Sequence, residues 1–298
     1  MKITQKNAYV IAGVMLLFAI IPSSWYVRLY YGLWPIQIDR TSTTVVENKS
    51  WEKLIHQGML DFKEHQYQEA ETNFKAALKL VNRSYPKIHP LRAKTLSLLG
   101  RVLLEQNKSS EAITALDETV DIEIAMLPEG DVGILKSLQT LMDALYQSGE
   151  TARAASTAKR LIAIADAHDK SVSEFVADAL VTLSKFHLEN DNVQAAKKLY
   201  LRVLDNQRQL YGEVSVSVVL ARFYITGIAV TNRDNLEVEK QIEACKSIIK
   251  SLSAPISPGD VELLGAFIEA LPSIGLADEA IEVRQLLHSL HPNLFVRG

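Results

Sequence analysis

From Trp51 onward, apolar residues recur at the three- and four-residue spacing of amphipathic helices, and no segment alternates apolar and polar residues as a strand would. Polar, glycine- or proline-containing stretches interrupt this pattern. The main breaks fall at residues 84–90, 127–131, 167–171, 210–214 and 253–260, and shorter ones between them at 105–110, 147–150 and 189–192. This alternation predicts an all-α chain of consecutive helical hairpins.

The predicted hairpins share an internal period of 42 residues. An alanine series defines it, with one valine member: Ala70, Ala112, Ala154, Ala196, Val238 and Ala280. Twelve residues before each lie Gly58, Gly100, Met142, Ser184, Thr226 and Ile268, and four residues after each lie Phe74, Leu116, Ala158, Tyr200, Ile242 and Arg284. Small side chains let two helices cross closely, and the residue four positions later covers the same helix face one turn on. Because one hairpin cannot bury its apolar face alone, we expect the hairpins to stack into a superhelix.

The stretch QYQEAETNFKAAL (66–78), with Gly58, Ala70, Phe74 and Ala77, resembles the tetratricopeptide repeat pattern. The usual repeat in that family has 34 residues, so a 42-residue unit adds about two helical turns and resembles the kinesin light chain-type subclass. The resemblance implies a right-handed superhelical solenoid of about six hairpins over residues 51–292, followed by a short tail at 293–298. Pro292 stands where the family often ends its second helix.

The N-terminal residues differ in character. After a short tail at 1–7, residues 8–27 form an uncharged stretch of 20 residues, which as a helix rises about 30 Å, one bilayer core. Aromatic residues between Trp25 and Trp34 crowd one end, as at a membrane interface. We expect a single-pass anchor, with a cleaved signal peptide as the alternative because the strictly apolar core, 8–21, is short. Lysines at positions 2 and 6 favour a cytoplasmic N-terminus and an extracytoplasmic (periplasmic) repeat domain. Residues 28–50 are then expected to be a juxtamembrane segment and linker.

Composition narrows the function classes further. A formal net charge of −3 provides no basic footprint for nucleic acid. The single cysteine, Cys245, excludes an intramolecular disulfide and falls at an inward-facing register position, so we expect a buried structural thiol. No nucleotide-binding, hydrolase or zinc-protease motif is present, and the histidines show no metal-ligand spacing. We therefore expect no catalytic residue, no cofactor and no metal; the acidic run at 116–131 is expected to form a solvated helix face.

The resemblance also implies where a partner binds, because the first helix of each hairpin lines the concave groove in that family. The groove positions carried over by register are apolar in the first hairpin, at Ile55, Met59 and Phe62. In the next three hairpins they are largely polar: Lys94, Ser97, Arg101 and Leu104, then Lys136, Gln139, Asp143 and Tyr146, then Asp178, Val181, Lys185 and Leu188. In the fifth hairpin they are apolar again, at Phe223, Gly227 and Val230. The family's carboxylate clamp for chaperone tails does not fit Ile55 and Met59. The asparagine ladder of kinesin light chains does not fit Ser97 and Leu98.

Arg101, Asp143 and Lys185 share one register position, which gives a plus–minus–plus ladder. These charges either pair with one another at little energetic gain or orient an extended peptide of a partner. The resulting hypothesis is a non-enzymatic, membrane-anchored scaffold that binds a protein or peptide in its groove and assists assembly, secretion or chaperoning at the membrane. The alternatives are a self-associating homo-oligomer, with an apolar flank near Phe267 and Leu271 on the weakest repeats, and an enzyme with an unrecognised site.

Overall fold

The computed structural model describes residues 42–252 and 256–290, which fold into twelve α-helices and one short 3₁₀-helix without any strand. The predicted tail at 1–7, the predicted anchor at 8–27 and the C-terminal residues from 291 lie outside this part. None of the described helices is long and apolar enough to cross a bilayer. The helices are α3 (Ser42–Lys63), α4 (Tyr67–Ser84), α5 (Pro90–Glu105), α6 (Ser109–Met126), α7 (Val132–Gln147), α8 (Thr151–Ala167), α9 (Glu174–Glu189), α10 (Val193–Tyr211), α11 (Val216–Thr231), α12 (Asn235–Ser251), α13 (Pro258–Ala270), η1 (Pro272–Ile274) and α14 (Ala277–Leu290).

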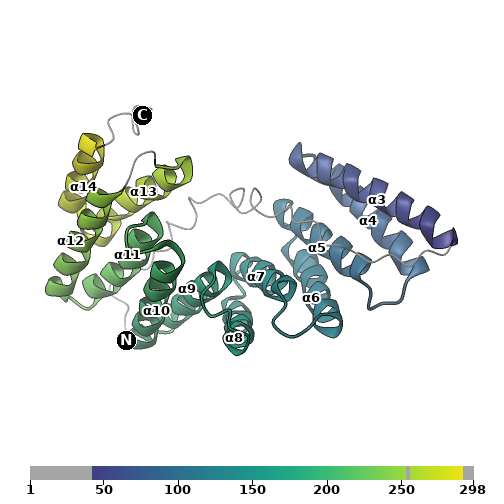
Figure 1. The fold of residues 1–298 in the computed structure, drawn as a ribbon, viewed down its shortest axis with the longest axis horizontal. Coiled ribbons are helices and arrows are strands. Elements are labelled where there is room, and N and C mark those ends of the chain that lie inside the picture. The colour runs from purple at the N-terminus through teal and green to yellow at the C-terminus, as the bar shows by residue number, and fades with distance from the viewer. Residues whose placement is uncertain (1–41, 253–255, 291–298) are drawn as a thin grey trace. The chain divides into compact units, whose positions relative to one another are not determined.

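Consecutive helices form antiparallel hairpins, in which α3 packs on α4, α5 on α6 and α7 on α8 (Figure 1). Neighbouring hairpins also pack through α4 with α5 and α6 with α7. The second helices α4, α6 and α8 begin at Tyr67, Ser109 and Thr151, and each start is 42 residues after the one before. The all-helical class and the hairpin order predicted from the hydrophobic pattern are therefore confirmed.

The turn inside each hairpin has one conformation throughout. A residue with left-handed backbone ends the first helix, and its amide donates to the carbonyl three residues earlier while the next amide donates to the carbonyl five residues earlier. This is the hydrogen-bonding pattern of a Schellman-type helix end. The left-handed residues are His65, Asn107, Gly149, Asp191, Arg233 and Gly275. Only two of the six are glycine, so the turn tolerates side chains at a modest conformational cost.

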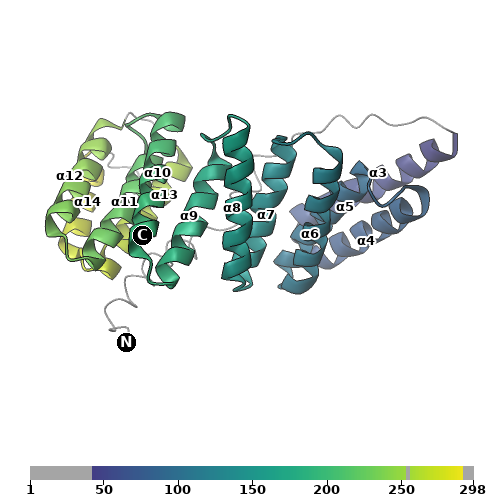
Figure 2. The same ribbon diagram turned by 90° about the horizontal axis from the view of Figure 1, so that it is seen from below.

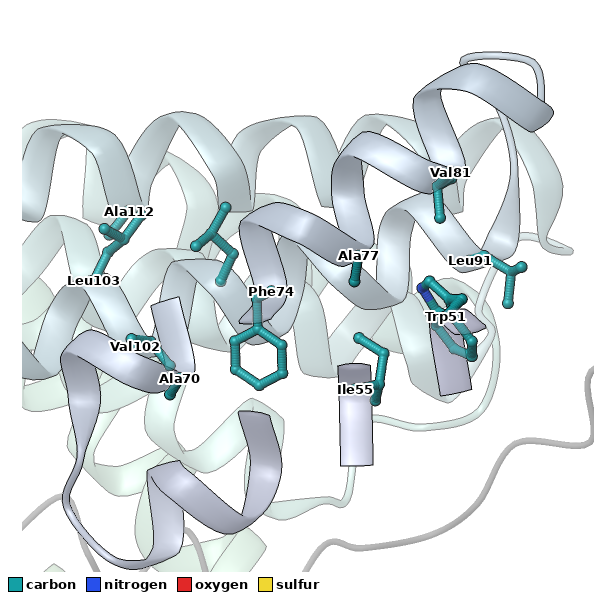
Figure 3. Packing of buried hydrophobic residues seen from close by; sticks show 11 residues of the cluster. Trp51, Ile55, Ala70, Phe74, Ala77, Val81, Leu91, Val102, Leu103 and Ala112 are labelled. Carbon is teal, nitrogen blue, oxygen red and sulfur yellow. The ribbon is translucent and has the colours of Figure 1, made fainter. Parts of the chain in front are cut away.

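The helix crossings explain the small residues of the pattern. A Cβ added to Gly58 would lie 2.7 Å from Cε1 of Phe74, and one added to Gly100 would lie 2.8 Å from Cγ of Leu116. Figure 3 shows the Phe74 ring inside the cluster that also contains Ile55, Ala70 and Ala77. Glycine on the first helix therefore makes room for a large side chain on the second.

The register positions are buried in most hairpins. Ala70, Ala112, Ala154 and Ala196 have no exposed surface. The pattern weakens toward the C-terminus, where Val238 is half-buried and Arg284, at the position of Phe74, is exposed. In the last hairpin α13 has only 13 residues, and η1 extends the turn before α14.

The described chain divides into two compact units, at residues 42–183 and 184–290. In the first unit α5, α6, α7 and α8 lie side by side with alternating direction (Figure 2). In the second unit α10 packs on α11 and α11 on α12, while α13 and α14 close against α11 and α12.

The first and second hairpins are joined by a buried carboxylate on α4. Glu71 accepts hydrogen bonds from Nζ of Lys75 (2.5 Å), Nζ of Lys108 (2.7 Å) and Nε2 of Gln106 (2.9 Å). Burial acts to raise the pKa of Glu71, but the hydrogen bonds from Lys108, Lys75 and Gln106 outweigh it and lower the pKa to about 2. Because Gln106 and Lys108 belong to the turn between α5 and α6, Glu71 fixes that turn against the first hairpin.

Two expectations are corrected here. The linker predicted to extend to residue 50 is wrong in its second part, because α3 already begins at Ser42; residues 42–50 contain no glycine or proline to stop the helix that Trp51 and Ile55 anchor in the core. The apolar flank predicted near Phe267 and Leu271 is also wrong. Both side chains are completely buried, because η1 and α14 cover the end of α13.

Candidate protein-binding face

The predicted groove positions of the second and third hairpins lie on α5 and α7, whose starts are fixed by side-chain caps. Nδ1 of His89 accepts from the amide of Leu91 (3.2 Å), with Pro90 as the first helical residue. Oδ1 of Asp131 accepts from the amide of Gly133 (2.7 Å). These caps satisfy free amides at each helix start. The two helices therefore present their polar positions from defined starting points.

Lys94 stands over the ring of Trp51, with Nζ 5.5 Å from the ring centroid. Trp51 is buried, and its Nε1 donates to Oγ1 of Thr95 (2.9 Å), which holds the indole in place beneath the lysine. Burial lowers the pKa of Lys94, and the charge of Glu52 opposes that shift only in part. Lys94 is thus a partly desolvated cation on an aromatic support.

Arg101 repeats this arrangement two turns along α5. Its guanidinium carbon lies 5.6 Å from the ring centroid of Phe62. Lys136 on α7 is close enough that burial, and then the charge of Arg101, lower its pKa, while Glu123 acts in the opposite direction. We call Lys94, Arg101 and Lys136 the cationic face. It lies beside Trp51 and Phe62 of α3.

The rest of the predicted face is more acidic and internally bonded. Gln139 on α7 donates to Oδ2 of Asp178 on α9, which brings two predicted positions of successive hairpins together. Ser97, on α5, is half-buried between Lys94 and Arg101. Asp143 is half-buried on α7. The face is thus cationic along α5 and acidic toward α9.

The charge ladder stays a prediction. Arg101 contacts the Phe62 ring, and Lys185, only 5% exposed, belongs to the second unit. The structure therefore places two of the three ladder residues, Arg101 and Asp143, in one unit.

The sequence analysis missed Glu123 on α6, behind this face. It lies in the acidic run predicted to be solvated, and Asp117, Glu118 and Asp121 of that run are indeed exposed or half-exposed. Glu123 instead turns inward, and its Oε2 is buried with no hydrogen-bond partner. Burial raises the pKa of Glu123 to about 7, although a hydrogen bond with Ser137 and the charge of Lys136 oppose the shift. The apolar residues on either side of it, Ile122 and Ile124, were the available signal, since they place position 123 near the edge of the buried stripe.

Other chemistry is scarce in the described residues. They contain no cluster of three or more histidine, cysteine or acidic side chains arranged for a metal ion. Cys245 is fully buried, as predicted, and burial raises its thiol pKa to about 12, which keeps it protonated at neutral pH.

Comparison with known proteins identifies the repeat. The sequence model described as "Tetratricopeptide repeat" matches residues 52–125. No curated protein matches the chain in sequence.

Among solved structures, the kinesin light chain nearly identical TPR-like repeats of Podosopora anserina are 19% identical, with a TM-score of 0.55, covering 67% of this chain and 93% of that one. BtubC (BKLC) from P. vanneervenii is 14% identical with a TM-score of 0.54, covering 85% and 95%. A tetratricopeptide repeat protein from Parabacteroides merdae is 18% identical with a TM-score of 0.54, covering 81% and 80%. Residues 52–125 therefore match the tetratricopeptide repeat in sequence, and the described residues have the fold of a tetratricopeptide-like helical solenoid.

Proposed function

We propose that the protein is a membrane-tethered scaffold whose cationic face binds an acidic segment of a partner protein. The observation that carries this proposal is the trio Lys94, Arg101 and Lys136, set on two neighbouring first helices beside Trp51 and Phe62. A carboxylate arriving here meets cations that have already lost part of their hydration, so less desolvation opposes the contact than at a fully hydrated lysine.

The membrane part of the proposal rests on residues 8–27. We propose that this uncharged stretch anchors the chain, with the N-terminus in the cytoplasm and the repeats on the extracytoplasmic side. In that position the scaffold would assist the assembly, secretion or chaperoning of proteins at the membrane. Protease treatment of spheroplasts tests the orientation, because extracytoplasmic repeats are cleaved while the cytoplasmic membrane is intact, whereas cytoplasmic repeats are cleaved only after lysis.

We also infer that residues 51–292 are an array of six 42-residue repeats of the kinesin light chain type. The starts of α5, α7, α9, α11 and α13 support this inference, since they fall at positions 90, 132, 174, 216 and 258. The left-handed residue of every hairpin turn has the same spacing. The similar structures named above include one of kinesin light chain repeats, which supports the same subclass.

Binding of a labelled peptide tests the cationic face. The full chain in detergent is titrated into a fluorescent decapeptide of alternating glutamate and alanine, and into a matched lysine–alanine peptide. We expect saturable binding of the acidic peptide alone, weakening as salt is added. Arg101→Glu or Lys136→Glu should weaken binding at least about tenfold, as expected for reversing a partly desolvated charge.

Lys159→Glu is the matched control, because it makes the same charge change at an exposed position of α8, a second helix. Equal losses for Arg101→Glu and Lys159→Glu would show that net charge alone attracts the peptide, and the proposed face would be wrong. Binding of the lysine peptide with similar affinity would contradict the proposal as well.

A further inference from the structure

The two edges of the first unit, residues 42–183, differ in polarity. Turns within hairpins lie at one edge and turns between hairpins at the other, because the helices alternate in direction. The turns within hairpins carry polar residues or glycine, at 64–66, 106–108 and 148–150. The turns between hairpins expose large apolar side chains: Ile88 (55%), Met126 (38%), Val132 (49%) and Val172 (39%). We call these four residues the apolar edge.

Two of the turns that carry the apolar edge are in contact. The turn between α6 and α7 touches the turn between α8 and α9, since Nζ of Lys170 donates to the carbonyl of Gly130. A Cβ on Gly130 would lie 2.3 Å from Cγ of His168. Val132 and Val172 therefore flank a packed junction and share one side of the unit.

These residues include four of the five large apolar side chains exposed in residues 49–183, the fifth being Leu60 on α3. Single exposed apolar residues are common on protein surfaces. Their collection on one edge, opposite an edge of polar turns, is the unusual feature, and it indicates a contact surface.

The chain itself indicates what covers this edge. α3 runs parallel to α5 and α7, so its start at Ser42 lies at the end where the turns between hairpins are. α3 has 22 residues and α5 has 16, so α3 extends about 9 Å farther toward that side. The stretch 8–27 precedes it, separated by residues 28–41, a length that spans at most about 50 Å. The chain therefore enters the first unit at the end of α3 that lies beside the apolar edge.

We propose that the apolar edge, formed by Ile88, Met126, Val132 and Val172, rests on the lipid surface of the membrane that holds the N-terminal stretch. This inference depends on the proposed tether. The tether gives the edge a high effective concentration at the bilayer. A lipid contact too weak to recruit the untethered protein is therefore sufficient to keep the edge on the membrane. In this orientation the helices of the first unit stand with one end at the membrane, and the faces of α5 and α7 stay accessible from the side.

Lipid-dependent quenching of a site-specific fluorophore tests the contact. The full chain is reconstituted into phosphatidylcholine vesicles that contain a lipid spin-labelled near its headgroup. Single cysteines labelled with a nitrobenzoxadiazole dye are introduced as Val132→Cys and Val172→Cys. Gln66→Cys is the control at the polar edge, where Gln66 is exposed. The buried Cys245 stays in place, and the unsubstituted chain shows whether it takes up dye.

We expect quenching of the dyes at 132 and 172 by at least about half and little quenching at 66. A Val132→Asp, Val172→Cys variant should lose quenching at 172 while the chain still floats with vesicles in a sucrose gradient. A chain that floats but shows equal quenching at 66, 132 and 172 overturns the inference and leaves the tether intact. A chain that does not float overturns both. Shielding of the dyes at 132 and 172 by a second protein, without lipid quenching, would mean that protein covers the edge and would also overturn the inference.

Discussion

In the first hairpin a glycine on α3 faces a phenylalanine on α4, whereas the third hairpin has a methionine and an alanine at the corresponding positions. Gly58 and Phe74 correspond to Met142 and Ala158. Phe74, Met142 and Ala158 have at most 1% of their surface exposed, and Gly58 is buried as well. The large side chain has moved from the second helix to the first. The comparison teaches that the crossing requires a roughly constant combined volume, as expected for a close-packed interior, and that neither position requires one residue type.

The largest effect is expected from emptying the first crossing. Phe74→Ala should lower the free energy of unfolding by about 3–5 kcal/mol, since it removes a buried ring and leaves a cavity. Gly58→Met added to Phe74→Ala copies the third hairpin and should recover part of that loss. Urea unfolding followed by circular dichroism measures both. If the second substitution makes the loss greater, the idea that the two hairpins are volume-equivalent is wrong.

A smaller effect is expected from overfilling the same crossing. Gly58→Ala should destabilise the protein by about 2 kcal/mol despite the better helix propensity of alanine, because the new methyl lies 2.7 Å from Phe74. Gly265→Ala in α13 is the matched control, since a Cβ there meets no atom within 4 Å. It should stabilise by up to about 1 kcal/mol. Thermal unfolding of both variants gives the comparison, and the same sign for both would contradict it.

The smallest effect concerns the two carboxylates beside these hairpins. Ionisation of Glu123 opposes folding, because its folded pKa of about 7 lies above the unfolded value of about 4.3. The protonated carboxyl of Glu123 therefore contributes its full stabilisation below about pH 4, and this stabilisation is lost as the pH rises through 7. Glu123→Gln should stabilise the protein by about 1–2 kcal/mol at pH 8 and change little at pH 5.

Glu71→Gln should do the opposite. Its folded pKa of about 2 means that the carboxylate supports folding above about pH 4, and this support is lost as the pH falls toward 2. The variant should therefore be less stable than the parent at pH 7, and the difference should shrink in acid. Urea midpoints measured from pH 2 to pH 8 separate the two carboxylates; parallel pH curves for both variants would refute the assignment.

Sequence periodicity was sufficient for the helices and their order, because every hairpin repeats one spacing of apolar positions. The periodicity did not predict the start of α3, because residues 42–50 do not carry apolar residues at helical spacing. Only the absence of glycine and proline favours a helix there. It also did not distinguish Glu71 and Glu123 from surface acids. Burial of a single carboxylate depends on which neighbouring turn or helix covers it, and that is a contact between distant parts of the chain.

For the candidate face, the register assigned Lys94, Arg101, Gln139 and Asp178 to groove positions but did not predict that Gln139 donates to Asp178. It did not reveal that Trp51 and Phe62 support the cations. The two aromatic residues lie on α3, 43 and 39 residues before their partners, and their approach depends on how the first hairpin docks. The sequence did not reveal the difference in polarity between the two edges either. This difference becomes visible only when the turns within hairpins are compared with the turns between hairpins.

The uniform left-handed turn has a consequence for how such a chain changes its length. Since each hairpin ends its first helix with the same backbone geometry, from His65 to Gly275, any two of these turns can be joined without rebuilding the connection. Removal or duplication of a whole number of 42-residue segments keeps the register of the crossing positions, whereas a change of another length inside a helix shifts large side chains into positions that hold small ones. When the join falls at these turns, the newly paired helices must also match in volume, since Gly58 opposite Ala158 would leave a void. We therefore expect insertions and deletions within the helices to be tolerated best as whole repeats, so that the length of the solenoid varies in steps.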